Sequence, residues 1–366
     1  MSREDSYRRF DYARRYGFTV DGPVPWSGYE AKPGSHDDGP NHGPFLGGLG
    51  TGAFSRDLGG CFSRWHLQPG LHVVQTIPQA RLFCRWSDRN GNAGSRWIGV
   101  GEAPGWENYR PAAVGFAENT REYAVLFPEC FEFYDDPDLP FRMLFRYWSP
   151  LVFGDESAAS MPVLYFSLHV ENKNDTPLEF AAAFFWPNIL GWQSSRVPSV
   201  DRGDQAWPGQ THSGNTARGE RGARDARGAG GAARGAQPAA PGGPTTGVVQ
   251  QRRPQQEVAL DLEGEVALSV AGPANGTVSR EICMKSDLNA IGLPPGEQKF
   301  TQAWAEQHFL DNGALPGTEE TWSAHWHEPV SSAVAGRTVV APRGDAVVDF
   351  TLAWDMPLVR FGSERT

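Results

Sequence analysis

The sequence has few cysteines and no long apolar segment. Its four cysteines, Cys61, Cys84, Cys130 and Cys283, lie far apart in the 366-residue chain and form no C-x-x-C pair. That spacing argues against a zinc site and a dense disulfide framework, so we expect reduced, buried thiols. No run of about 18 apolar residues occurs, and the N-terminus lacks the apolar core of a signal peptide. We therefore expect a cytoplasmic protein without a membrane span.

Basic residues are also in deficit, with 33 Lys and Arg against 43 Asp and Glu and a net charge of −10. An acidic surface repels a phosphate backbone, so we expect no nucleic-acid partner for the folded body. The segment ARGERGARDARGAGGAARG at 217–235 resembles an RG-type RNA-binding tract. Acidic residues interrupt it and no aromatic residues are interleaved for base stacking, which favours a solvated loop over RNA binding.

Apolar residues make up 39% of the chain and aromatic residues 12%. Residues that favour turns are also abundant, with 43 Gly and 29 Pro. Period-2 alternation places the apolar residues of several segments on one strand face. Examples are Leu164, Phe166, Leu168 and Val170, then Val266, Leu268 and Val270, then Ala346, Val348, Phe350, Leu352 and Trp354. Further strands are expected at 141–147, at 258–262 and at 178–186, the last forming a hairpin with 164–170.

This pattern predicts an all-β fold, a large antiparallel β-sandwich, with short helices expected only at 2–15 and 319–327. Composition divides the chain into an N-terminal extension at 1–40 and a first sandwich part at 41–202. A Gly/Ala/Arg-rich insertion at 203–256 follows, and the second sandwich part spans 257–366. The insertion has too few large apolar side chains to offset the entropy of ordering, so we expect it to be disordered.

The glycine-rich segment GGLGTGA at 47–53 fits the dinucleotide-binding pattern G-x-G-x-x-G/A. That site requires a preceding buried strand and a following helix. The preceding residues are turn formers, and Gly59-Gly60 interrupts any helix that would follow. No G-K-[ST] occurs either, which excludes a P-loop. We therefore expect these glycines to allow close backbone packing within or between strands.

Two further clusters have ordinary structural explanations. His325-Trp326-His327-Glu328 offers two histidines but no identifiable third ligand, so we predict no metal site. Asp135, Asp136 and Asp138 could supply the carboxylate pair of a glycoside hydrolase, but an Asp-Asp-Pro-Asp segment between aromatic strands is typical of a solvated turn. No G-x-S-x-G occurs. We predict no catalytic residue and no cofactor.

Several motifs together resemble the N-terminal domain of glycoside hydrolase family 116, the family of non-lysosomal glucosylceramidase, also called bile acid β-glucosidase. They are GGLGTG at 47–52, FSRWHLQPG at 62–70, SP at 149–150, MPV at 161–163, VEN at 170–172 and WDMPLVRFG at 354–362. His66 departs from the Gln that is common in the family. The resemblance implies that Arg64, Trp65, Trp354, Asp355 and Arg360 are binding or domain-interface residues.

In that family the W-D-M-P segment leads into an (α/α)₆ barrel that carries a nucleophilic Glu and an acid/base Asp. Neither motif occurs here, and the sequence stops at Thr366. We therefore expect a non-catalytic sandwich domain from a truncated or split gene, with a catalytic barrel as partner and β-glucosides as the related substrates. The alternatives are a free-standing carbohydrate-binding module, suggested by the 13 Trp, and a decayed gene product without activity.

Overall fold

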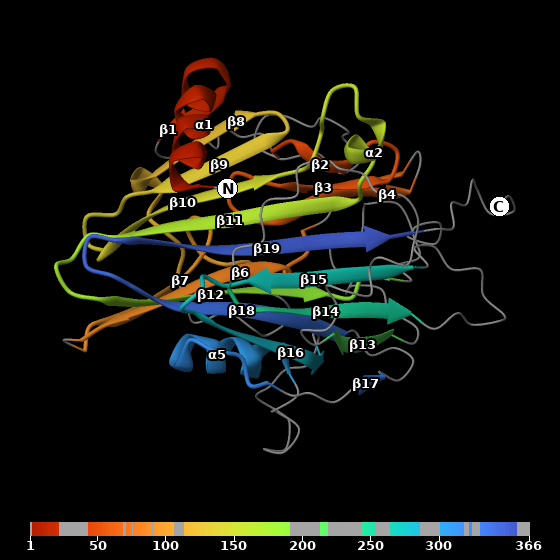
Figure 1. Cartoon of the computed structure of the whole chain (residues 1–366). Coiled ribbons are helices and arrows are strands. Elements are labelled where there is room, and N and C mark those ends of the chain that lie inside the picture. The colour runs from red at the N-terminus through yellow and green to blue at the C-terminus, as the bar shows by residue number, and fades with distance from the viewer. Residues whose placement is uncertain are drawn as a thin grey trace, which may run out of the picture.

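The computed structural model describes residues 2–21, 43–68, 71–74, 76–89, 91–105, 113–190, 213–218, 243–252, 264–285, 301–317, 322–323 and 330–356. Most of these residues form antiparallel strands, and few form helices, so the predicted all-β sandwich is confirmed (Figure 1). The strands that the structure describes belong to sheets of ten, five and four strands.

The ten-stranded sheet has the order β1-β8-β9-β10-β11-β19-β15-β14-β13-β17. Its strands are β1 (Phe18–Asp21), β8 (Arg121–Leu126), β9 (Glu129–Tyr134), β10 (Phe141–Trp148), β11 (Val163–Asn172), β13 (Ser213–Arg218), β14 (Thr245–Arg252), β15 (Glu265–Ala271), β17 (Trp322–Ser323) and β19 (Asp345–Asp355). The five-stranded sheet, β16-β18-β12-β6-β7, contains β6 (Arg81–Asp88), β7 (Ala93–Trp97), β12 (Leu178–Pro187), β16 (Thr277–Lys285) and β18 (Val330–Val340). The four-stranded sheet runs β2 (Phe45–Gly48), β3 (Gly52–Arg56), β4 (Phe62–Gln68) and β5 (Leu71–Val74). The described helices are α1 (Arg3–Tyr16), α2 (Glu156–Ala159) and α5 (Gln302–Asn312), and a described 3₁₀ turn spans Glu118–Thr120.

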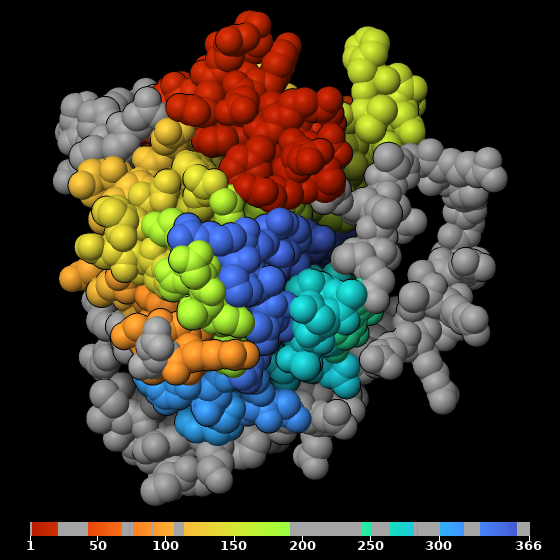
Figure 2. All heavy atoms as spheres, turned by 60° about the vertical axis from the view of Figure 1, so that its left-hand side comes forward, coloured from red at the N-terminus to blue at the C-terminus, as the bar shows by residue number. Residues whose placement is uncertain are grey.

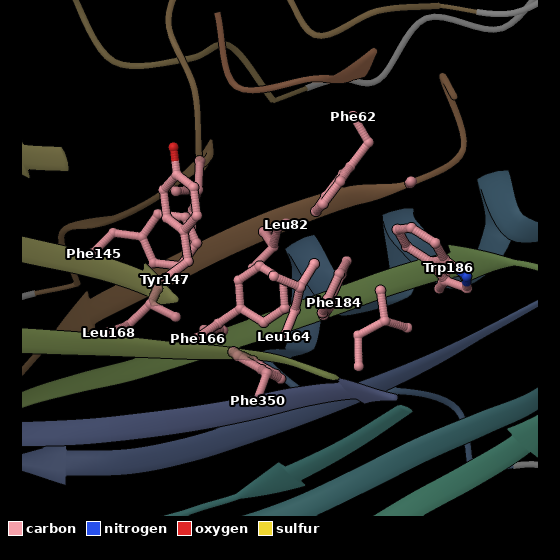
Figure 3. Packing of buried hydrophobic residues seen from close by; sticks show 14 of the residues in the cluster. Phe62, Leu82, Phe145, Tyr147, Leu164, Phe166, Leu168, Phe184, Trp186 and Phe350 are labelled. Carbon is pink, nitrogen blue, oxygen red and sulfur yellow. The ribbon is translucent and has the colours of Figure 1, made fainter. Parts of the chain in front are cut away.

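The core lies between the two large sheets, where aromatic side chains from alternate strand positions meet. Phe184 of β12 packs on Phe166 of β11 and Phe350 of β19, with ring centroids 5.2 and 6.1 Å apart. Phe62 of β4 stacks on the same Phe184 at 5.9 Å, so the four-stranded sheet contributes to this core (Figure 3). All four rings are at most 1% exposed. Truncating such a ring to alanine typically costs about 3–5 kcal/mol.

The predicted hairpin between 164–170 and 178–186 is wrong, although both segments are strands. β11 pairs with β10 and β19 in the ten-stranded sheet, whereas β12 pairs with β6 and β18 in the five-stranded sheet. Asn172 redirects the chain, because its side-chain amide donates to Thr176 O and to Ala341 O in the β18–β19 turn, at 2.8 and 3.1 Å. Both faces of β12 are buried, as the continuous apolar run AAAFFWP requires of a central strand.

The predicted N-terminal extension, 1–40, is described over residues 2–21, where it packs on the ten-stranded sheet. The predicted helix is confirmed as α1: Ser2 caps its start by accepting from Asp5 N at 3.1 Å, and it ends before Gly17. Phe10 and Ala13 are buried against Ala124, Phe131 and Leu144. Arg3, Arg9 and Arg14 form ion pairs with Glu171, Glu129 and Glu122 of the sheet. After the helix, β1 pairs with β8.

Helix α5 was not expected from the sequence. Thr301 caps its start, and Gly313 ends it in the left-handed conformation at φ 69°. Its buried Ala305 and Phe309 cover the outer face of the five-stranded sheet, which explains why that sheet is apolar on both sides. The expected helix at 319–327 lies mostly outside the described residues, and the part that is described, Trp322–Ser323, is a strand instead.

Two strands fall inside the segment 203–256 that composition predicts to be disordered. β13 and β14 pair with each other, and β14 continues the ladder to β15. Val248 and Val249 of β14 are buried. The Arg-rich residues 219–235 lie outside the described residues. Among the helices that the structure describes, none has the length and apolar character needed to cross a membrane.

Candidate functional site

The glycine-rich segment forms a β-hairpin, β2–β3, in which Gly48 lies opposite Gly52. The segment after the glycines is therefore a strand, as its context predicts, and a dinucleotide-binding turn into a helix is excluded. Gly52 has φ 100°, a conformation that favours glycine. A Cβ on Gly48 would lie only 2.5 Å from Ser160 O and 2.7 Å from Met161 O, so the hairpin and the segment around Ser160 pack backbone against backbone.

Trp354, near the end of β19, holds this hairpin from the core side. Its indole Nε1 donates to Thr51 O at 2.7 Å, and its ring packs edge-on against Phe54 at 5.1 Å. A Cβ on Gly52 would lie 3.1 Å from the same Nε1, so glycine makes room for the indole. Trp354 is 3% exposed. It therefore fixes the hairpin to the last strand of the sandwich.

Arg64 and Trp65 lie on adjacent positions of β4 and so point to opposite faces of the four-stranded sheet. Trp65 lies opposite Phe54 in the ladder and belongs to the main core. Arg64 donates to Gly43 O at 2.8 Å and lies over the Phe45 ring at 4.7 Å. Both side chains are 2% exposed, so in this structure neither presents a surface to a sugar. Their geometry is that of braces within the domain.

Asp355 is the last residue of β19 and is exposed to solvent. It pairs with Glu265 of β15, and its carbonyl lies so close to Gly264 that only glycine fits there. Arg360 lies outside the described residues. Trp65 and Trp354 thus both lie next to Phe54, and Arg64 lies on the opposite face of β4. Asp355 lies at the solvent-exposed end of β19.

A neighbouring element that sequence reasoning missed is the α2 loop, residues 149–160. Leu49 N donates to Ala159 O, and Thr51 Oγ1 donates to Ser160 O, both at 2.8 Å, so the loop is bonded to the hairpin turn. Asp155 caps α2 by accepting from Ala158 N at 2.9 Å. The available signal was the sequence Gly-Asp-Glu-Ser, in which Asp155 is a good helix cap.

The buried carboxylates that the structure describes have structural partners. Glu132 pairs with Arg56 and accepts from Tyr134 OH in the core, and both members of the pair are under 3% exposed. Arg56 also donates to Ile98 O. Burial raises the pKa of Asp57, whose carboxylate accepts from Cys61 N at 2.8 Å in the β3–β4 turn. These groups hold turns and sheets together.

A second polar group lies on the outer face of the ten-stranded sheet. Ser167 donates to Asp349 across the β11–β19 ladder, and burial raises the pKa of that carboxyl. His169 is 2% exposed, and burial lowers its pKa to about 4. Neither of its ring nitrogens has a hydrogen-bond partner among the described residues. The imidazole is therefore neutral near pH 7.

The aspartate-rich segment is a turn, as predicted. It joins β9 to β10, and Asp136 accepts from Asp138 N at 2.9 Å. Cys84 and Cys130 are buried free thiols, and Cys61 is a half-buried free thiol, in accord with the predicted thiols. Burial raises the pKa of both Cys84 and Cys130 to about 12. The His325–Glu328 cluster lies outside the described residues, and the described part of the chain contains no group of side chains suited to a metal ion.

The tryptophan side chains whose burial the structure describes lie inside the fold or are half-buried. The buried ones are Trp65, Trp86, Trp97, Trp186 and Trp354, and Trp148 and Trp304 are half-buried. Most of the buried ones belong to the main core, as their alternating strand positions predict. A carbohydrate-binding module uses such rings at the surface, and these five buried rings are not available for that contact.

Comparison with known proteins defines the family. The sequence model of "beta-glucosidase 2, glycosyl-hydrolase family 116 N-term" matches residues 43–366. The chain therefore belongs to glycosyl hydrolase family 116 and contains the N-terminal domain of that family. The suspected family resemblance is thereby confirmed.

Two solved structures are similar to the chain at low sequence identity. A putative kojibiose phosphorylase from human microbiome is 7% identical, with a TM-score of 0.30 over 85% of this chain and 29% of that protein. The Slr1438 protein from Synechocystis sp. PCC 6803 is 11% identical, with a TM-score of 0.27 over 86% of this chain and 95% of that protein. The chain thus spans less than a third of the length of the phosphorylase.

Proposed function

We propose that this chain acts as a non-catalytic β-sandwich that supports the (α/α)₆ catalytic barrel of a family 116 β-glucosidase-like enzyme. The observation that carries the proposal is the match of residues 43–366 to the family's N-terminal domain. The buried Glu132 and the half-buried Asp57 support it, because both carboxylates have the structural partners described above. A cytoplasmic location stays a prediction.

The expected site residues have a supporting role in this proposal. Trp354 and the Gly48–Gly52 hairpin stiffen the edge where β19 ends, and Arg64 and Trp65 brace the adjoining four-stranded sheet. Asp355 is exposed at the end of β19 and is the candidate, among the described residues, for direct contact with the barrel. Arg360 follows it in the sequence and is assigned to the same contact.

The reaction of the assembled enzyme would be retaining hydrolysis of a β-glucoside. One barrel carboxylate would attack the anomeric carbon while the other protonated the leaving oxygen, and water would then release the sugar. Both groups would belong to the barrel. This chain would hold the barrel in position and form part of the rim of its cleft.

Binding of this chain to a family 116 catalytic domain is the direct test of the proposed partner. The purified chain is mixed with the separately produced catalytic domain of a family 116 β-glucosidase, and the masses of the species are measured by sedimentation velocity. We expect an equimolar complex. If the two sediment independently while the chain alone binds glucosides, with a shift in Trp fluorescence, the carbohydrate-binding alternative replaces this proposal.

A further inference from the structure

The α2 loop (149–160) projects from the sandwich and has an apolar tip. Figure 2 shows the segment as a lobe at the upper edge of the molecule. The side chain of Phe153, at its tip, is fully exposed, at 105% of the reference area, and the preceding Val152 is 48% exposed. Single exposed apolar residues are ordinary on protein surfaces. Here the two are adjacent, at the end of a projecting element.

The tip is held in place by its own hydrogen bonds. Asp155 N donates to Val152 O at 3.1 Å, Ala159 N donates to Asp155 O at 2.9 Å, and the Asp155 side chain caps α2. Gly154, at φ 82°, makes the sharp turn after Phe153. A preorganised loop loses little conformational entropy on binding, which makes an exposed phenylalanine on it an effective anchor.

Two hydrogen bonds connect the base of the loop to the end of β19 through the β2–β3 turn. The bond from Leu49 to Ala159 connects the loop to the β2–β3 turn, and the bond from Trp354 to Thr51 connects that turn to β19. Leu49 itself is 62% exposed and adds a third apolar side chain beside the loop. At no more than about 3.6 Å per residue, the stretch that follows Asp355 up to residue 366 stays within about 40 Å of Asp355.

We propose that the α2 loop is a docking surface for the catalytic barrel, the docking knob, with Phe153 as the anchor residue at its tip, Val152 next to it in the sequence and Leu49 at the base of the loop. The inference rests on the proposed function and names the surface that carries it. The loop lies within the family match at 43–366, whereas α1 lies before it, so the loop is the projection expected to meet a partner shared by the family. The exposed Glu156 next to the tip predicts an apolar pocket with a basic rim on the barrel.

The test compares affinities of single variants of the full chain for the catalytic domain of a family 116 β-glucosidase, measured by isothermal titration calorimetry. Phe153→Ser is expected to weaken binding about 30-fold, the scale of a hot-spot residue, and Val152→Ser several-fold. Val339→Ser is the matched control, because Val339 is 52% exposed on β18 of the other sheet. Its affinity is expected to equal that of the unaltered chain.

The outcomes separate the knob from the proposed function. If the unaltered chain does not bind the catalytic domain, the proposed function fails. If it binds and Phe153→Ser binds equally well, the knob is wrong and the function stands. Self-association of the unaltered chain that Phe153→Ser abolishes, seen by sedimentation equilibrium, would assign the knob to a second copy of the chain and overturn the inference.

Discussion

Replacement of Trp354 by phenylalanine tests the link between the glycine hairpin and β19. The smaller ring can keep the edge-on contact with Phe54, now 5.1 Å between centroids, but it cannot donate to Thr51 O. Loss of a donor that leaves a partly buried carbonyl without its partner costs about 1–3 kcal/mol. We therefore expect the free energy of unfolding to fall by about 1–3 kcal/mol, and by about 4 kcal/mol or more for Trp354→Ala, which also leaves a cavity.

The assay is urea unfolding followed by tryptophan fluorescence, combined with native-state hydrogen exchange. Exchange at the amide of Leu49, which is bonded to Ala159 O, should accelerate in Trp354→Phe because the hairpin loses its support. Trp148→Phe is the matched control, since that ring is half-buried and lies at a tilt with its centroid 5.5 Å from that of Tyr165. A Trp354→Phe protein within about 0.5 kcal/mol of the unaltered chain, with unchanged exchange at Leu49, would refute the reasoning.

Three other predictions concern the interior. His169 has a folded pKa of about 4 against an unfolded value of about 6.5, so its contribution to stability is complete above pH 6.5 and is lost as the pH falls toward 4. The unaltered chain should lose about 3 kcal/mol more than His169→Leu over that interval in pH-dependent urea unfolding, and parallel curves would contradict the assignment. Cys84 and Cys130 should resist a thiol reagent at pH 8 until the protein unfolds, as followed by mass spectrometry, and rapid native labelling would show that they are accessible. Glu132→Gln should lower the free energy of unfolding by about 3–5 kcal/mol in urea unfolding, because it leaves Arg56 buried without its counter-charge. Adding Arg56→Met to that variant should recover part of the loss. A double variant whose loss equals the sum of the two single losses would argue against coupling.

Alternation along the sequence identified strands and their buried faces but not their partners. The pattern at Leu164–Val170 and at 346–354 predicts which side chains are buried, and those predictions hold for Phe166 and Phe350. Pairing depends on what covers each face. The run before Pro187 is apolar on both faces because α5 covers one of them, and that helix has no strong apolar periodicity by which the sequence could reveal it.

The candidate site was likewise predictable in part: the sequence indicates the residues but not their contacts. The motifs identified the family and drew attention to Arg64, Trp65 and Trp354, but no spacing rule indicates that Trp354 donates to Thr51, 303 positions away in the sequence. Burial of Arg64 was equally hidden, because an arginine in a strand is ordinarily at the surface. The turn at Asp136 was predictable, since its hydrogen bond to Asp138 N is local.

The most direct test of the central claim is hydrolysis of an aryl β-glucoside by the chain alone, by a family 116 catalytic domain alone and by their equimolar mixture. We expect no hydrolysis by the chain, and a mixture that is more active, or retains activity to a higher temperature, than the catalytic domain alone. Hydrolysis by the chain alone, or a mixture indistinguishable from the catalytic domain, would contradict a supporting, non-catalytic role for this sandwich.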